Sequence, residues 1–322
     1  MRGTVLKVVV LLVCMLLFSA VEAYCVSSKA YYLQGNQYFI KKKYDRAIEK
    51  YEKALEINPK VADYHYKLAE TYRLKESGDE AIACYRDAIK IEPQYYEAYA
   101  GLGEIFFKRG ETEEAARYYR KAIDACSSDS KDHFFLGRIW GIRGDTDGAI
   151  REYQRAIRIN PGYFDALSNL AMCYASKGDF RKAVLYYVEA RKIRPYDEPT
   201  VVDMGIAYTK LKEFNRARDI LLIALKINLF NRDTRFYLGK AYYGMGNLDQ
   251  AIKQTEKALE IDPRNPETHF TLGLYYDKKD WVDMAIAEYR ETQLLDPDYI
   301  IKRVKGMGEK AIGEKAKKQQ AE

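Results

Sequence analysis

One pattern recurs along most of the chain at a fixed spacing of 34 residues, and it restricts the possible fold more than any other feature. Each copy of the pattern resembles the stretch from Tyr31 to Pro59, and eight copies run from residue 28 to residue 299 without an insertion or a deletion. A small residue follows Gly35 at every step of this spacing, at Ala69, Gly103, Gly137, Ala171, Gly205, Gly239 and Gly273. Alanine stands at every position equivalent to Ala47, namely Ala81, Ala115, Ala149, Ala183, Ala217, Ala251 and Ala285. A period of this length predicts an array of repeated units rather than separate globular domains.

The residues within one copy predict two helices. In the second copy, His65, Leu68, Ala69 and Tyr72 have the spacing that places side chains on one stripe of a helix. Small, large and small residues, such as Ala81, Tyr85 and Ala88, form the equivalent stripe of a second helix. Glycines between the two helices, at Gly110, Gly144, Gly178 and Gly246, can adopt the left-handed conformation that ends a helix. Prolines such as Pro59 end the second helix. We therefore expect antiparallel helix pairs stacked one on the next.

This combination of length and of small, aromatic, alanine and proline positions resembles the tetratricopeptide repeat (TPR) family. The resemblance covers residues 28–299 and implies an all-α, right-handed α-solenoid, a superhelix of antiparallel helix pairs. The expected repeats are 28–61, 62–95, 96–129, 130–163, 164–197, 198–231, 232–265 and 266–299. Because each repeat packs only on its neighbours, residues 28–299 should behave as one extended domain.

The two ends of the chain differ from the repeats. Residues 1–23 have the pattern of a secretory signal peptide, with Arg2 and Lys7 before an apolar stretch and a small residue, Ala23, at the expected cleavage site. The apolar stretch is shorter than the roughly 20 residues of a membrane-spanning helix, although an uncleaved anchor remains the alternative. Residues 300–322 are predicted to begin as a capping helix and to end as a lysine-rich tail.

Charge and cysteine content limit the possible partners. The net charge is +6, and much of it lies in residues 300–322, which hold seven Lys or Arg against three acidic residues. The nearly neutral repeats do not favour a nucleic-acid binder. Of five cysteines, Cys14 lies in the expected signal peptide, and the sequence leaves the redox state of Cys25, Cys84, Cys126 and Cys173 open. The sequence contains no CxxC motif, so we expect no metal site. Next to Tyr174, Cys173 is expected to be a small buried thiol.

We find no constellation of catalytic residues and expect neither an enzyme nor a cofactor. His65, His133 and His269 occupy the same position of three repeats that are two or four repeat lengths apart, so they cannot converge on one substrate or metal. Each is expected to lie at the edge of the core. Acidic residues at the second position of several repeats, such as Asp63 and Glu97, lie in the first turn of a helix, where they complement its dipole.

The family resemblance implies a binding surface on the face of the first helices, which lines the concave side of the solenoid. Large or charged residues recur on this face and form the predicted partner-binding set: Tyr32, Asn36, Phe39, Tyr66, Phe107, Phe134, Arg138, Phe236, Lys240, Tyr243 and Phe270. Exposed rings serve as anchors in peptide-binding grooves. The alternative is that these rings complete the packing between neighbouring first helices. The family's clamp for chaperone tails is incomplete here, because Tyr32 replaces its lysine.

The sequence thus predicts a non-enzymatic scaffold that binds a protein or peptide through the concave face. The signal peptide adds an exported location, periplasmic in a bacterium and otherwise secreted or lumenal. One alternative is an accessory or regulatory subunit of an envelope enzyme or secretion complex. Another is a membrane-anchored receptor, in which contact with the membrane would involve an uncleaved N-terminus or the basic tail.

Overall fold

The computed structural model of the chain describes residues 28–126 and 128–302, and these residues form helices joined by short turns, without a strand. They divide into two compact units, Met1–Pro161 and Gly162–Glu322, which we describe separately. Each unit contains four of the predicted repeats. The expectation that residues 28–299 form one extended domain stays a prediction.

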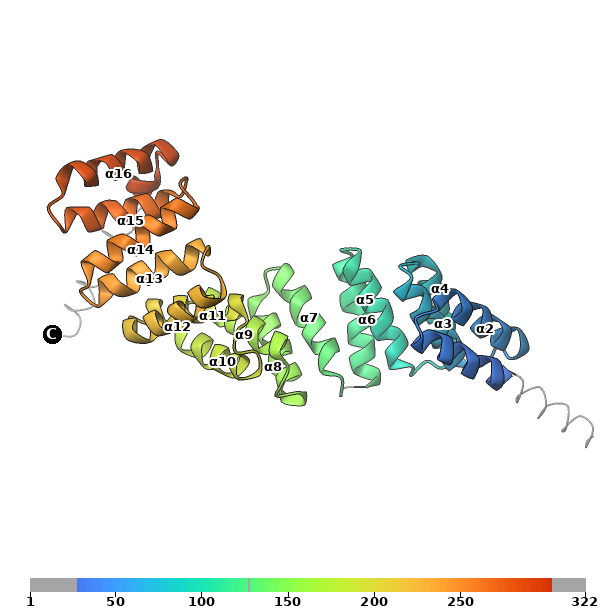
Figure 1. Cartoon of the computed structure of the whole chain (residues 1–322). Helices are drawn as coiled ribbons and strands as arrows, with labels where there is room; N and C mark the ends of the chain where they lie inside the picture. The colour runs from blue at the N-terminus through green and yellow to red at the C-terminus, as the bar shows by residue number, and fades with distance from the viewer. Residues whose placement is uncertain (1–27, 127, 303–322) are drawn as a thin grey trace, which may run out of the picture. The chain divides into compact units, whose positions relative to one another are not determined.

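The first unit begins with a helix over residues 28–40. It continues with α2 (Tyr44–Ile57), α3 (Ala62–Leu74), α4 (Gly78–Ile91), α5 (Tyr96–Lys108), α6 (Thr112–Ala125), α7 (Ser130–Ile142) and α8 (Thr146–Ile159). Consecutive helices such as α3 and α4, or α5 and α6, pack against each other as pairs (Figure 1).

The second unit repeats the same alternation of helices. It contains α9 (Phe164–Ser176), α10 (Phe180–Ile193), α11 (Glu198–Lys210), α12 (Phe214–Ile227), α13 (Arg232–Gly244), α14 (Leu248–Ile261), α15 (Pro266–Asp277) and α16 (Val282–Leu295). In Figure 1, α13 lies beside α14, and α15 lies beside α16.

The helix boundaries confirm the 34-residue register. In all eight repeats the second helix has 14 residues and begins at the same position, the seventeenth of the repeat. The first helices from α3 to α15 each begin at the first residue of a predicted repeat. The all-α solenoid predicted from the sequence is therefore the observed fold.

In seven of the eight repeats the core pairs a small residue on the first helix with a large one on the second, whereas repeat 7 has Thr255 at the position of the large residue. Ala47 and its seven equivalents are buried, as are Ala54 and its equivalents. A side chain at Gly35 could not be accommodated, since its Cβ would lie 2.5 Å from Cε1 of the Tyr51 ring. The same close approach occurs at Gly137, where a Cβ would lie 2.7 Å from Cε1 of Tyr153. The small residue thus allows the bulky side chain of the second helix to fill the space between the paired helices.

The turn inside each repeat has one residue in the left-handed conformation. Four repeats place glycine there, at Gly110, Gly144, Gly178 and Gly246, as the sequence predicts. The other four place Lys42, Glu76, Lys212 and Asp280 in the same conformation, with φ between 55° and 62°. Residues with a Cβ adopt this conformation at a cost, so these four turns carry local strain that the glycine turns avoid.

Several predictions about the ends of the chain fall at or beyond the described residues. The signal peptide over residues 1–23 lies outside them. A helical turn does begin at residues 299–302, where Tyr299 packs on Phe270 with a ring separation of 5.7 Å, but the rest of the predicted cap and tail lies outside the described part. No described helix combines the length and the apolar character needed to cross a membrane.

Candidate functional site

Three of the predicted partner-binding rings are buried, which contradicts the expectation that they face solvent. Phe236 is 0% exposed, and Phe134 and Phe270 are each 7% exposed. Two of them contact a ring on the second helix of the same repeat. Phe134 lies 5.9 Å from the Tyr153 ring and Phe270 lies 5.7 Å from the Tyr289 ring. These three rings belong to the core, as the alternative interpretation expects, but Phe134 and Phe270 pack on the second helix of their own repeat rather than only between neighbouring first helices.

Two further rings of the set are half-buried between neighbouring first helices. Tyr32 stacks on Tyr64 at 4.7 Å, and its hydroxyl donates a hydrogen bond to Asp63. Burial and this hydrogen bond raise the pKa of Tyr32 to about 12. Tyr66 packs on Tyr95 at 5.2 Å. Asp63 also accepts a hydrogen bond of 3.0 Å from the Tyr95 hydroxyl, so this acid links repeats 1 and 2 in addition to its place in the first turn of α3.

The remaining predicted residues of the first unit lie at two places. Asn36 accepts a hydrogen bond of 2.7 Å from the Tyr51 hydroxyl, and Phe39 packs on Tyr44 at 6.0 Å. Phe107 and Arg138 come together, because the Arg138 guanidinium lies 4.7 Å above the Phe107 ring. Arg138 is exposed and therefore offers a cation on the face of the first helices.

In the second unit, Lys240 and Tyr243 lie on the face of the first helices. The Lys240 ammonium lies 4.1 Å from the centre of the Phe236 ring and 2.9 Å from a Glu267 carboxylate oxygen. Tyr243 stacks on Tyr275 at 4.7 Å and remains 44% exposed. Within each unit, therefore, the predicted residues lie at separate places and do not form one site.

A hollow of about 200 Å³ lies on the face of the first helices in the first unit. Its walls come from α3, α5 and α7, with Tyr119 of α6 between them. Repeat 3 has Ala100 where repeats 2 and 4 have the rings of Tyr66 and Phe134. The missing ring leaves space between the neighbouring repeats, which explains why the hollow forms here.

One wall of the hollow is an ion-pair network centred on Arg73. Its guanidinium donates two hydrogen bonds to Glu70, at 3.0 and 2.8 Å, and one of 2.9 Å to Glu104. Glu104 also pairs with Lys108 at 3.0 Å. Burial would raise the pKa of Glu70, but hydrogen bonds from Arg73 and from the Tyr85 hydroxyl outweigh it and hold that pKa below its ordinary value. The positive charge of Arg73 is thus already shared between two carboxylates.

The Tyr119 hydroxyl lines the hollow without a hydrogen-bond partner among the described residues. Tyrosines at the same position of repeats 1 and 2 do have partners, since Tyr51 donates to Asn36 and Tyr85 donates to Glu70. The equivalent acceptor in repeat 3 is Glu104, which instead bonds Arg73 and Lys108. Burial is the main cause that raises the pKa of Tyr119, so its hydroxyl stays protonated. A buried hydroxyl without a partner costs free energy.

Asp132 lines the same hollow and is the more unusual of the two groups. It is the third residue of repeat 4, a position that is alanine, tyrosine or threonine in the other repeats. Its side chain is 1% exposed, and its Oδ2 atom has no hydrogen-bond partner among the described residues. Burial, followed by the negative charge of Asp129, raises the pKa of Asp132 to about 7. Asp132 and Tyr119 therefore present an unsatisfied acceptor and an unsatisfied hydroxyl in one small space.

The lining of the hollow is acidic and aromatic. Its carboxylates outnumber its cations by five to two: Glu70, Glu97, Glu104, Asp129 and Asp132 against Arg73 and Lys131. Rings complete the lining, at Tyr66, Tyr96, Tyr119 and Phe135. Aromatic faces and carboxylates both attract cations. The hollow is therefore suited to a positively charged group.

The second unit has a comparable hollow whose polar groups are paired. It measures about 200 Å³ and is lined by apolar residues of α9 and α11 together with Tyr187 and Asp203. Here the Tyr187 hydroxyl donates to Asp203 at 3.4 Å. Burial raises the pKa of Asp203, while this hydrogen bond opposes the shift. The same tyrosine position thus has an acidic partner in repeat 5 and none in repeat 3.

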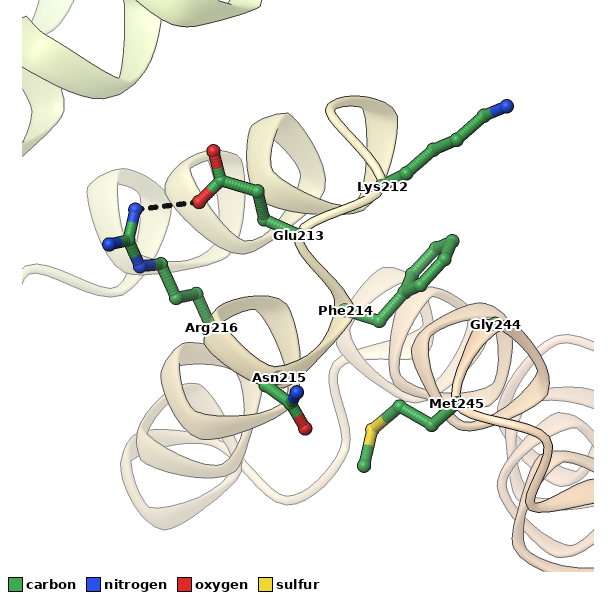
Figure 2. A pocket seen from close by; sticks show the side chains of 7 residues that line it. All are labelled: Lys212, Glu213, Phe214, Asn215, Arg216, Gly244 and Met245. Atoms are coloured by element: carbon green, nitrogen blue, oxygen red, sulfur yellow. Dashed lines mark hydrogen bonds and ion pairs between the residues drawn. The ribbon is translucent and has the colours of Figure 1, made fainter.

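A larger hollow of about 430 Å³ lies at the turn between α11 and α12, against the end of α13 (Figure 2). Gly244 provides room for the Phe214 ring, because a Cβ there would lie 2.4 Å from Cε2 of Phe214. Glu213 and Arg216 on its rim form an ion pair at 2.7 Å. Its charged groups are exposed or paired with each other, so it offers a ligand little beyond surface contact.

The histidines have structural partners, as expected for residues at the edge of the core. The Nδ1 atom of His133 lies 2.8 Å from Glu152, and that of His269 lies 2.6 Å from Glu288. His65 hydrogen-bonds the carbonyl of Pro59 at 2.8 Å. Among the described residues, no group of histidine, cysteine and acidic side chains has the geometry of a metal site.

Cys84, Cys126 and Cys173 are free thiols. Cys173 is half-buried, less than the sequence predicts, and burial raises the pKa of its thiol. Burial likewise raises the pKa of Cys84 to about 12. Neither thiol has the low pKa of a reactive cysteine.

The residues that define the hollow in the first unit were missed by the sequence reasoning, although two signals were present. Ala100 stands where repeats 2 and 4 have rings, and Asp132 is the one acid at the third position of a repeat. Both signals appear when the eight repeats are compared position by position for exceptions.

Family models of the tetratricopeptide repeat match several stretches of the chain. One matches residues 35–75, 137–178 and 239–280, a second matches 66–130, and a third matches 164–197. Together these stretches cover more than half of the 322 residues. No curated protein matches the sequence significantly.

Solved structures of low sequence identity share the fold. A structure of pilF from Pseudomonas aeruginosa is 18% identical, with a TM-score of 0.53, over 64% of this chain and 93% of that one. A structure of the APC/C hetero-tetramer Cut9–Hcn1 is 19% identical, with a TM-score of 0.50, over 83% of this chain and 52% of that one. MamA from Desulfovibrio magneticus RS-1 is 22% identical, with a TM-score of 0.50, over 53% of this chain and 96% of that one.

Proposed function

Because the chain belongs to the tetratricopeptide repeat family, we propose that it is a non-enzymatic scaffold that binds a partner protein or peptide on the face of its first helices. The hollow between α3, α5 and α7 carries the proposal, because it holds two buried polar groups that the described residues leave unsatisfied. A bound segment would supply the missing hydrogen bonds and recover the free energy that their burial costs.

The size of the hollow favours a side chain of a protein over a free metabolite. Small-molecule sites commonly enclose roughly 300–1,000 Å³, whereas this hollow has about 200 Å³. Arg138 on α7 is exposed, and the half-buried Phe107 on α5 lies beneath its guanidinium, so this pair is available for contacts along the rest of a peptide. Several weak subsites on one stiff surface would then add up to useful affinity.

A ring introduced at Ala100 tests this proposal with little risk to the fold. Repeats 2 and 4 carry rings at the equivalent position, so Ala100→Phe should fill the hollow and keep the helix. Partners captured from the native compartment by the wild-type chain should be lost with Ala100→Phe. They should be retained with Ser176→Phe, which adds the same ring at an exposed site of α9. Equal capture by all three proteins would contradict a binding role for the hollow.

An exported location is part of the same proposal and rests on the signal-peptide pattern of residues 1–23. The intact mass of the protein purified from its native compartment tests it. A mass that lacks residues 1–23 supports export with cleavage. The full mass together with membrane association supports the anchored receptor instead.

A further inference from the structure

We propose that the hollow lined by Asp132 and Tyr119 is a receptor for a cationic side chain of the partner, the ammonium of a lysine or the guanidinium of an arginine. This inference rests on the proposed scaffold function and adds the chemistry of the group that the scaffold recognises.

The two unsatisfied groups set the requirement for the ligand. The Oδ2 atom of Asp132 can only accept a hydrogen bond once the carboxyl is ionised, and the oxygen of Tyr119 can accept a second one. A ligand that satisfies both must therefore bring N–H or O–H donors. A lysine or arginine side chain brings several donors and also the charge that an ionised, buried carboxylate lacks.

The surroundings of Asp132 favour a cation over a neutral donor. Charged and titratable groups that line the same hollow come from every element around it: Asp129 before α7, Lys131 on α7, Tyr119 on α6, Tyr96, Glu97 and Glu104 on α5, and Tyr66, Glu70 and Arg73 on α3. Arg73 is held by Glu70 and Glu104 at the opposite wall. Lys131 is exposed at the rim. The charge of Lys131 opposes the rise in the pKa of Asp132 without outweighing burial. Among the described residues neither cation forms a hydrogen bond or an ion pair with Asp132, so an incoming cation would be its first direct counter-ion.

The rings provide a second kind of contact for the same ligand. Tyr119 and Phe135 stack almost parallel, with centroids 5.4 Å apart and an angle of 7° between the rings. Tyr66 and Tyr96 line the hollow with them. The methylene groups of a lysine or arginine can pack along such rings while the charged end reaches a carboxylate. An acidic peptide would instead meet an excess of carboxylates and be repelled.

Blocked pentapeptides test the inference on the full chain lacking its first 23 residues. We would titrate acetyl-Ala-Ala-X-Ala-Ala-amide at pH 8 and follow the protein by NMR, with X as lysine, arginine, acetyl-lysine, citrulline or glutamate. The lysine and arginine arms identify which cation is preferred, and the acetyl-lysine and citrulline arms keep the shape without the charge. We expect saturable binding of the lysine or the arginine peptide, with at least tenfold weaker binding of the neutral and acidic ones. Equal affinity for a charged peptide and its neutral counterpart would overturn the inference.

Variants of the chain locate the binding. Asp132→Asn should weaken binding of the preferred peptide at least tenfold, since a hydrogen bond to a charged group contributes roughly 1.5–3 kcal/mol. Asp124→Asn removes the same charge from an exposed site of α6 outside the hollow and should leave affinity within twofold. Unchanged affinity of Asp132→Asn would contradict the assignment even if the charged peptides bind.

The pH dependence of the association constant distinguishes a binding role of Asp132 from a purely structural one, which would leave this constant independent of pH. Since Asp132 ionises near pH 7, the fraction of its carboxylate rises about tenfold between pH 6 and pH 8. The association constant of the wild-type protein should rise by a similar factor, and that of Asp132→Asn should stay flat. If partner capture is lost with Ala100→Phe but no peptide discriminates by charge, the scaffold function stands and the cation inference fails. If capture is unaffected by Ala100→Phe, the scaffold function fails at this surface.

Discussion

The buried carboxyl of Asp132 should make the stability of this protein depend on pH in a direction opposite to that of most acidic residues. Its pKa lies at about 7 in the folded chain, against an ordinary value of 3.8. Between these two pH values the unfolded chain has lost the proton and the folded chain still holds it. Stability is therefore greatest below the ordinary value, falls as pH rises toward 7, and stays level above it.

The magnitude follows from the same shift. Each pH unit between the two pKa values costs about 1.4 kcal/mol of unfolding free energy, so the whole shift corresponds to about 4 kcal/mol. Between pH 5 and pH 8 the loss caused by Asp132 should be about 3 kcal/mol. The substitution Asp132→Asn removes the titrating group and keeps nearly the same shape. At pH 5 the wild type has already lost about 1.5 kcal/mol by the same slope, so a variant that behaves like the neutral acid should be more stable by about that amount. By pH 8 the difference should have grown by about a further 3 kcal/mol.

Two measurements check this expectation. Urea unfolding of both proteins at pH 5, 6, 7 and 8 gives the change in stability difference, and every other titrating group cancels because both proteins share it. Carbon-13 NMR of the side-chain carboxyl groups, with Asp132→Asn to assign the signal, gives the pKa directly. A stability difference that does not vary with pH, or an Asp132 signal that titrates near pH 4, would refute the description of Asp132 as a buried acid without a counter-ion.

Five other substitutions test the packing and the turns, each by urea unfolding of the full chain. Glu76→Gly should stabilise the chain by about 0.5–1 kcal/mol, because it removes the strain of a residue with a Cβ in the left-handed conformation. Gly110→Ala at the equivalent turn should destabilise the chain by a similar amount. A change of the same sign in both variants would contradict the strain. Phe236→Ala should lower the free energy of unfolding by about 3–5 kcal/mol because its ring is fully buried, whereas Tyr243→Ala on the exposed face should lower it far less. Similar losses in the two variants would mean that burial does not separate core from surface here. Gly137→Ala should lower the free energy of unfolding by about 1–3 kcal/mol, because its Cβ would lie 2.7 Å from the buried Tyr153 ring. An unchanged midpoint of urea unfolding would show that the helix pair can separate at that contact.

The fold could be predicted because its determinants repeat. Ala47 and its equivalents recur at the same position in every repeat, and the structure buries each of them. Repetition averages out the uncertainty that a single helix boundary would carry. Even the left-handed turn residues follow the register, although Glu76 and Lys212 could not have been assigned that conformation from residue type alone.

The candidate site could not be predicted in the same way, since it depends on departures from the repeat. The predicted set followed recurring rings, and recurrence at a helical spacing marks the core: Phe236 is the clearest example. Asp132 and Ala100 each occur once at their positions. Their meaning depends on which side chains of neighbouring helices face them, and the orientation of Tyr119 and of the Arg73 network is visible only in three dimensions.

The coincidence of these departures is what separates a binding site from a packing defect. A small residue alone at position 100 would leave a dry gap, which a neighbouring side chain could fill. An acid alone at position 132 would find water or a neighbouring cation. Here the gap and the acid lie in consecutive repeats and face the same hollow, and Tyr119 adds a second unsatisfied group between them. Alanine, as at the equivalent Ala98 and Ala166, would remove the burial cost of the acid. Burial of the unpaired Asp132 carboxylate lowers the stability of the folded chain, and a partner's cation can recover this free energy on binding. A substitution that removes the carboxylate should therefore raise stability and weaken recognition.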